Sequence, residues 1–296
     1  MTSPSADQLS LKDEIVDLEK RLQDAKARFK PSDAGPTKST VTADAALHAL
    51  LLLSDSALPL GSFAFSSGLE SYLAHHKPSP PSASQLPNFH TFLRLSLSTL
   101  ASTALPYVLT TYRHPEEIER LDNDFDASTP CTVARRASIA QGRALLAVWD
   151  RSFKTQYNDA AADANRHDTN GSMGSNVAVK ALAGFSSALR TSEYINVHLA
   201  PLWGLVTKVL SIPLHESAYI FLFSHARAVV SAAVRASVMG PYQAQAVLAS
   251  SELQNRIRGL VDQAWHKTVE DAGQSVPVMD LWVGRHEKLY SRIFNS

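Results

Sequence analysis

The stretch that decides the fold is residues 51–70, LLLSDSALPLGSFAFSSGLE. Its apolar beginning is typical of a helix, and Pro59 and Gly61 end that helix. A serine after the aromatic pair can cap a second helix, which begins near Gly68. The stretch therefore predicts a corner between two helices.

Two interpretations of this corner remain open. In the first, it is ordinary turn chemistry that buries the two aromatic side chains, Phe63 and Phe65. In the second, its polar side chains are exposed and build a site: Asp55, Ser66, Ser67 and Glu70.

The pattern on both sides of the corner is helical almost throughout. Apolar residues recur at helical spacing over 43–54, 89–112, 132–157, 195–210, 215–238 and 243–272. We expect Thr42 to cap the first of these helices, and Pro106 to break the second near Leu105. Because strand alternation with hairpin turns is absent, the sequence predicts an all-α fold.

The predicted organisation is a single helical-bundle domain over residues 41–296, preceded by an extension over residues 1–40. Two breaks interrupt the domain, a proline-rich connection over 77–87 and a polar, mobile surface insertion over 158–176. The extension contains one short amphipathic helix within 9–29 and a linker over 31–40. That helix either docks on its own protein or makes a coiled-coil contact with a partner.

Composition excludes several classes of protein. With 28 basic and 28 acidic residues, the chain lacks the basic surplus of a nucleic-acid binder. The single cysteine, Cys131, excludes an intrachain disulfide and a multi-cysteine metal cluster. Uninterrupted apolar runs such as 49–53 and 218–223 are much shorter than the about 20 residues of a spanning helix. We therefore expect a cytoplasmic protein that binds neither nucleic acid nor membrane.

Motifs of common enzymes are missing as well. The sequence contains no GxxxxGK[ST], Rossmann glycine pattern, HExxH, CxxC or GxSxG. Its eleven histidines show no ligand spacing, since His75 and His76 diverge on a helix and His215 and His225 lack acidic or cysteine partners nearby. We therefore predict neither catalytic residues nor a metal site.

Five segments resemble the UreF family of urease accessory proteins. The first is SDSALPLGSFAFSSGLE over 54–70, and the last is RHEKLYSRIFNS over 285–296, which is similar to the family's HExxYSRLFxS. Between them lie ASIAQGRALLAV over 137–148, NVHLAPLWGLV over 196–206 with His198 and Gly204, and AAVRASVMGPYQAQ over 232–245. Asp55 and Asn295 depart from the family pattern.

The resemblance implies an all-helical homodimer without enzymatic activity. Such proteins bridge UreD, also called UreH, to the GTPase UreG, and the assembly activates apo-urease by lysine carbamylation and insertion of two nickel ions. No cofactor would be bound stably, and nickel would be handled by the complex. The first motif supplies five structural residues, namely Pro59, Gly61, Phe63, Gly68 and Glu70.

The C-terminal segment is the candidate partner-binding site, either docking on the protein's own core or facing UreD. Its candidate residues are Arg285, His286, Glu287, Tyr290, Ser291, Arg292, Ile293 and Phe294. Arg235 lies among apolar residues and is expected either to pair with a carboxylate, such as Glu70, or to contact UreG. Gly240 and Tyr242 belong to the turn beside it. His198 is a candidate for simple helix packing.

Two rival functions compete with this interpretation. One is a helical serine hydrolase with Ser66 or Ser67 as nucleophile and a distant histidine as base. The other is a generic helical adaptor whose N-terminal helix is the binding element.

Overall fold

A computed structural model describes residues 18, 20–21, 38–80, 82–155, 173–191 and 195–295. The chain divides into two compact units, Met1–Asp44 and Ala45–Ser296, and the site discussed below belongs to the second. The predicted helix within 9–29 lies almost wholly outside the described residues, as do residues 31–37 of the predicted linker and 158–172 of the predicted insertion. The described ends of these two segments are helical, since one helix begins at Lys38 and another at Met173, so the predicted bounds 31–40 and 158–176 are wrong there.

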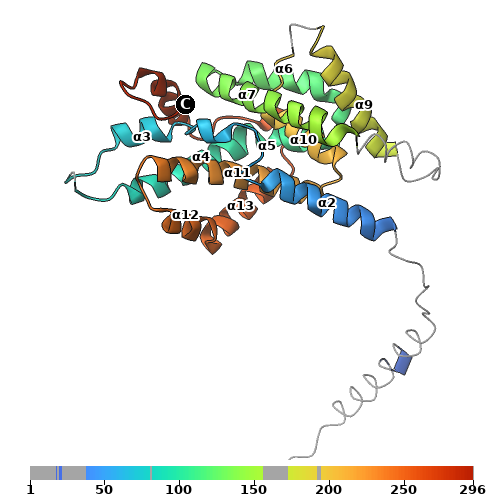
Figure 1. The fold of residues 1–296 in the computed structure, drawn as a ribbon, viewed down its shortest axis with the longest axis horizontal. Helices are drawn as coiled ribbons and strands as arrows, with labels where there is room; N and C mark the ends of the chain where they lie inside the picture. Colours follow the sequence, from blue (N-terminus) through green and yellow to red (C-terminus); the bar gives the residue numbers. More distant parts are fainter. Residues whose placement is uncertain are drawn as a thin grey trace, which may run out of the picture. The chain divides into compact units, whose positions relative to one another are not determined.

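The described residues form helices and connections without a strand, so the predicted all-α fold is confirmed (Figure 1). In chain order, the elements are α2 (Lys38–Ser54), η1 (Ser62–Ala64), α3 (Leu69–His75), α4 (Leu86–Thr103), α5 (Leu105–Arg113), η2 (Pro115–Glu117), α6 (Ile118–Ser128), α7 (Thr132–Val148), η3 (Trp149–Phe153), α9 (Met173–Ala188), α10 (Leu199–Val209), α11 (Leu214–Arg235), α12 (Pro241–Leu248), α13 (Ser251–Ala264), η4 (Val269–Asp271), α14 (Val278–Arg285) and η5 (His286–Lys288).

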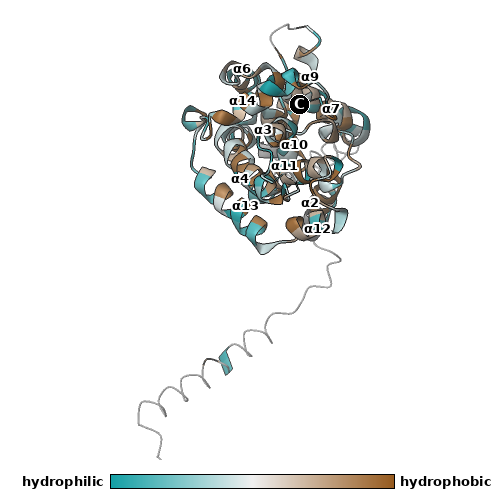
Figure 2. Ribbon diagram, turned by 90° about the vertical axis from the view of Figure 1, so that its left-hand side faces the viewer, coloured by the Kyte–Doolittle hydropathy of each residue, from teal (hydrophilic) through white to brown (hydrophobic). Residues whose placement is uncertain are grey.

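Two apolar helices form the centre of the bundle. α10 packs against α5, α6, α7 and α9, while α11 packs against α4, α5, α12 and α13. Figure 2 shows α10 and α11 in the middle, with the other helices around them. The helical stretches Leu86–Arg113 and Leu214–Arg235 are apolar and long enough to cross a membrane by length and composition, but 61% and 50% of their apolar windows are buried inside the domain. The sequence argument did not identify these stretches, because it considered only uninterrupted apolar runs and both stretches contain polar residues.

Helix boundaries follow local chemistry in most places. The break predicted near Leu105 is confirmed, because α4 ends at Thr103 and Pro106 lies in the first turn of α5. The proline-rich connection is also non-helical where it is described, as far as the start of α4. By contrast, α2 already begins at Lys38, so Thr42 lies inside it, and residues 195–198 are not helical. The helix predicted over 243–272 is interrupted before Ser250, whose side chain caps α13.

Glycine allows α10 to approach its neighbours closely. A Cβ atom on Gly204 would lie 2.3 Å from the carbonyl oxygen of Val108 in α5. On α7, a Cβ atom on Gly142 would lie 2.0 Å from the carbonyl oxygen of Val197. Real Cβ atoms do not approach an oxygen this closely, so a larger residue at either position would push two backbones apart.

A buried carboxylate fixes the segment that leads into α10. Asp122 of α6 accepts hydrogen bonds from the backbone N–H groups of Asn196, Val197 and His198, at 2.8, 3.0 and 2.6 Å. Val197 has φ +67°, an unfavourable conformation for a β-branched residue. These charge-assisted hydrogen bonds hold the strained turn in place and satisfy donors that precede the helix.

The contact at Gly204 generates a stability prediction. We expect Gly204→Ala to lower the free energy of unfolding by about 3 kcal/mol, because the new methyl group overlaps the α5 backbone. The matched control is Gly259→Ala in α13, where a Cβ atom meets nothing within 4 Å. That variant should be more stable by about 0.5–1 kcal/mol from helix propensity. Urea denaturation measures both, and equal effects would contradict the close approach.

Candidate functional site

The carboxylate of Glu70 in α3 clamps the C-terminal segment to the first motif. One oxygen accepts a hydrogen bond from His286 Nε2 at 2.8 Å and from the Phe294 N–H at 3.3 Å. The other oxygen accepts the Ile293 N–H at 2.8 Å. The Asn295 N–H donates to the carbonyl oxygen of Ala64 at 2.8 Å, and we call these contacts together the Glu70 clamp. Figure 1 shows the C-terminal segment, in dark red, beside α3.

The motif around Glu70 has a backbone that depends on glycine. Gly61 and Gly68 have φ values of +69° and +88°, and a Cβ atom on Gly68 would lie 3.0 Å from Val283 of α14. Gly68 is also the residue that directly precedes α3, and it has no side chain, so the capping hydrogen bond comes from one of the two predicted serines further upstream. Ser66 Oγ accepts the Glu70 N–H in the first turn of α3 at 3.4 Å, as the prediction of a serine cap requires.

Arg235 does not pair with Glu70, which corrects the expected ion pair. Its guanidinium lies 4.4 Å from the centre of the Phe294 ring, and Phe294 is buried. This cation–π contact joins the end of α11 to the same segment that Glu70 holds. Opposite charge alone could not identify the partner of Arg235, because both oxygens of the Glu70 carboxylate already accept hydrogen bonds from the C-terminal segment.

The rest of the C-terminal segment faces outward. His286 and Phe294 are buried, whereas the other candidates are exposed, namely Arg285, Glu287, Tyr290, Ser291, Arg292 and Ile293. Glu287 forms an ion pair with Arg136 of α7. The segment therefore docks on its own domain through His286, Phe294, its backbone and the ion pair of Glu287, while Arg285, Tyr290, Ser291, Arg292 and Ile293 are exposed.

Other predicted residues separate into exposed and buried groups. Phe63 is 68% exposed, so the expectation that both aromatics of the corner are buried is wrong. Ser66 is fully buried, which does not suit the proposed nucleophile. Asp55 is exposed and accepts the Ala57 N–H, and the structure does not bring it to Glu70. Tyr242 is 91% exposed at the start of α12, and Gly240 is its N-cap.

Aromatic side chains of α3 and α14 pack together next to the clamp, and we call them the aromatic layer. The Tyr72 ring stacks on His76 with centroids 4.0 Å apart and meets Trp282 edge-on at 4.6 Å. Because Tyr72 belongs to α3 and Trp282 to α14, the layer fixes the two helices that carry Glu70 and lead into His286. Burial raises the pKa of Tyr72.

A cavity of about 360 Å³ lies beside the clamp. Its walls come from the loop before α3 and from α4, α7, α11 and α14 among other segments, and they are mostly apolar. On one wall, Ser96 Oγ lies 2.6 Å from His225 Nε2. Burial lowers the pKa of His225 to about 4, so this imidazole is neutral at pH 7.

His198 is a structural residue, in agreement with the helix-packing interpretation. It is fully buried, its Nε2 lies 3.0 Å from Asp126 Oδ1, and its Nδ1 lies 3.1 Å from Ser138 Oγ. Ser138 Oγ also accepts the Leu199 N–H at 3.3 Å. Sequence reasoning missed these partners, although acidic residues on the apolar stripe of α6 were a usable signal of a buried carboxylate.

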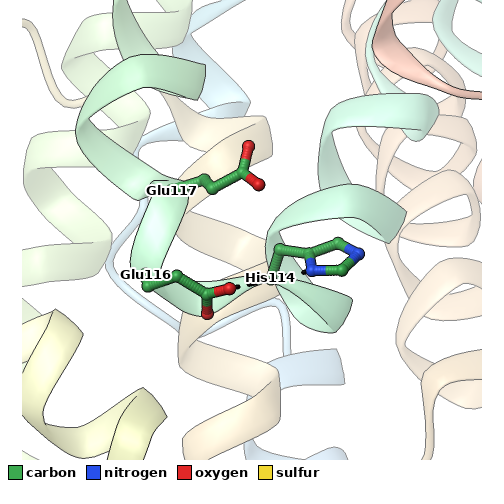
Figure 3. Close-up of side chains that lie close together, drawn as sticks. All are labelled: His114, Glu116 and Glu117. Carbon is green, nitrogen blue, oxygen red and sulfur yellow. Dashed lines mark ion pairs between the residues drawn. The ribbon is translucent and has the colours of Figure 1, made fainter.

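One surface cluster has the residue types of a metal site. His114, Glu116 and Glu117 each offer a ligand atom, and these atoms lie within 4.8 Å of one another (Figure 3). His114 and Glu116 are exposed, and Glu117 already forms an ion pair with Arg120, which also bonds Asp124. The cluster is explained as a surface ion-pair network.

The clamp generates a prediction about the C-terminal segment. In Glu70→Gln, the neutral amide no longer offers a charged acceptor to His286, Ile293 and Phe294, so we expect a loss of about 2 kcal/mol in stability. Amide exchange in the peptide that contains residues 289–295 should accelerate at least tenfold. Mass spectrometry of exchanged peptides measures this rate, and unchanged protection would contradict the clamp. Glu252→Gln, at an exposed position of α13, is the control.

His225 generates a prediction about pH. Its folded-state pKa of about 4 lies below the unfolded value of 6.5, so the unfolded chain binds the proton first as the pH falls. Because the folded protein keeps this imidazole neutral, the free energy of unfolding should fall by about 2 kcal/mol as the pH is lowered from 7 to 5. Above pH 7 the imidazole is neutral in both states, so His225 should not affect the pH dependence of stability there. We expect His225→Gln to flatten this part of the pH profile relative to wild type. His90→Gln, an exposed control, should not.

Comparisons with a family profile and with individual proteins point to the same family. The sequence profile described as UreF matches residues 87–252. A relative from Schizosaccharomyces pombe, named uncharacterized urease accessory protein UreF-like, is 34% identical over 84% of this chain and 97% of its own length. Urease accessory protein 6 of Cryptococcus neoformans is 27% identical, over 84% and 97% of the two chains. Urease accessory protein F of Arabidopsis thaliana is 29% identical, over 82% and 90%.

The profile covers more than half of the chain, and the alignment with the fission-yeast relative covers 84% of it. The clamp, the glycines of the first motif and the close approach at Gly204 all lie within segments that resemble the same family. The chain therefore belongs to the UreF family.

Proposed function

We propose that this chain is a non-catalytic subunit of the urease maturation machinery, which presents its C-terminal segment to UreD and bridges UreD to the GTPase UreG. The observation that carries the proposal is the division of that segment into a docked side and an exposed side. The Glu70 clamp fixes the backbone, and the exposed side chains are thereby presented in one arrangement. A preordered segment loses less entropy on binding than a free one.

The exposed side chains have the chemistry of a protein interface. Tyr290 is fully exposed and Ile293 is 61% exposed, while Arg285 and Arg292 supply positive charge beside them. Tyrosine and arginine are enriched among residues that dominate binding energy. Phe63 lies in η1 next to Ala64, whose carbonyl oxygen accepts a hydrogen bond from the segment, and it adds an exposed aromatic ring from the first motif. This combination supports a protein partner, for which we propose UreD.

The corner between α11 and α12 is the proposed contact for UreG. Arg235 is engaged with Phe294, so it links this corner to the UreD-facing segment, and Gly240 and Tyr242 present the exposed surface. We propose that the subunit acts as a homodimer in the cytoplasm. Nickel passes to apo-urease within the complex and is not bound stably by this chain.

The test separates partner contact from folding. We expect Tyr290→Ala combined with Ile293→Ala to lower co-purification with UreD at least tenfold. Neither substitution removes a clamp contact, because Ile293 contributes its backbone N–H, so the unfolding midpoint should stay the same. Deleting 285–296 is less informative, since it also leaves the partly buried Glu70 carboxylate without its partners.

Leu47→Ala combined with Leu51→Ala is the matched control, because these side chains of α2 are 55% and 60% exposed. Each variant is then co-expressed with apo-urease, UreD and UreG, and urease activity and nickel content are measured. The tail variant should lose activation, and the α2 variant should keep it. Full UreD binding by the tail variant would defeat the proposed contact, and full activation without this chain would defeat the proposed function.

A further inference from the structure

We propose that the cavity beside the Glu70 clamp is a binding site for an uncharged organic molecule with a mostly apolar body. This inference does not depend on the urease machinery, and it concerns the isolated chain. The cavity volume of about 360 Å³ lies in the range of small-molecule sites, which is about 300–1,000 Å³.

The walls of the cavity are already built by packed helices. α4 and α11 form one side and α7 forms another, and α4 and α11 pack directly against each other. The remaining side is closed by α14 and by the loop that precedes α3. The Glu70 clamp holds these two walls together, because Glu70 follows that loop and His286 follows α14. A ligand would therefore meet a largely preformed site, which lowers the entropy cost of binding.

Two buried hydroxyl groups on the same wall have no hydrogen-bond partner. They are Thr99 Oγ1 of α4 and Ser224 Oγ of α11, and both residues line the cavity. An unsatisfied buried hydroxyl is costly, and a bound molecule with one donor or acceptor would remove that cost. The neighbouring pair of Ser96 and His225 adds a further polar position on this wall.

The charge of the lining selects against an anion. Among the described residues that line the cavity there is no lysine or arginine, and His225 is neutral at pH 7. Asp280 of α14 is a carboxylate at the lining, so it repels a second negative charge. A charged group without a partner is expensive to place among apolar walls. Nucleotides, phosphates and carboxylates are therefore poor ligands for this site.

The test uses two fluorescent dyes that differ in one charge. N-phenyl-1-naphthylamine is uncharged, and 8-anilinonaphthalene-1-sulfonate is the same ring system with a sulfonate group. Titrated into the full chain at pH 7.5, the uncharged dye should bind with saturation at one molecule per chain. The sulfonate should bind at least tenfold more weakly, because the cavity offers it no cation.

Filling the cavity provides the structural control. Ala228→Phe, on the α11 wall, should weaken binding of the uncharged dye at least tenfold, whereas Ala246→Phe, exposed on α12, should leave it unchanged. Ser224→Leu is the second filling variant, and it decides the matter if Ala228→Phe does not fold. It also removes a hydroxyl that has no partner, so its unfolding midpoint should not fall.

Several results would overturn the proposal. Equal affinity for both dyes, or binding that does not saturate, would show adsorption on the exposed apolar surface. Loss of binding in Phe63→Ser together with unchanged binding in both filling variants would place the dye outside the cavity. Selective, saturable binding that both folded filling variants abolish would support the proposed site.

Discussion

The carboxylate of Glu70 is the point at which the first motif and the last segment of the domain meet. It accepts three hydrogen bonds from residues about two hundred positions further along the chain, and it is largely buried. Without these donors, a buried negative charge would remain unsatisfied, so the C-terminal segment is required for a stable α3. The aromatic layer, Arg235 and one wall of the cavity are all positioned by the segments that this carboxylate joins.

Local chemistry explains how much of the fold could be predicted. A proline cannot stand in a helix interior without disrupting it, so Pro106 marks a helix boundary. The apolar periodicity of the other helices can be read from the sequence without knowing which helices they pack against. The all-α class and the corner at Pro59 and Gly61 followed from such rules. The precise start of α10 did not, because the backbone of residues 196–198 is held in a non-helical turn by Asp122, which lies far away in the sequence.

The sequence identified most residues of the candidate site, but it did not identify which of them contact one another. Family resemblance identified Glu70, Arg235 and the C-terminal segment, yet charge complementarity suggested the wrong pair. The choice between His286 and Arg235 as partner of Glu70 depends on tertiary geometry, which periodicity does not contain. The cavity was not predicted at all, since its polar wall combines Ser96 and Thr99 of α4 with Ser224 and His225 of α11. Each of these residues alone is unremarkable in a helix.

The aromatic layer under the clamp has a spectroscopic consequence. Of the four tryptophans in the chain, Trp282 is the one that meets Tyr72 directly and shares α14 with the start of the clamped segment. Its indole is 9% exposed in the docked arrangement, so any event that lifts α14 from α3 admits water to the ring. Emission from this tryptophan therefore shifts to longer wavelength when the clamp opens, which gives the protein an intrinsic optical reporter of its C-terminal segment without any added label.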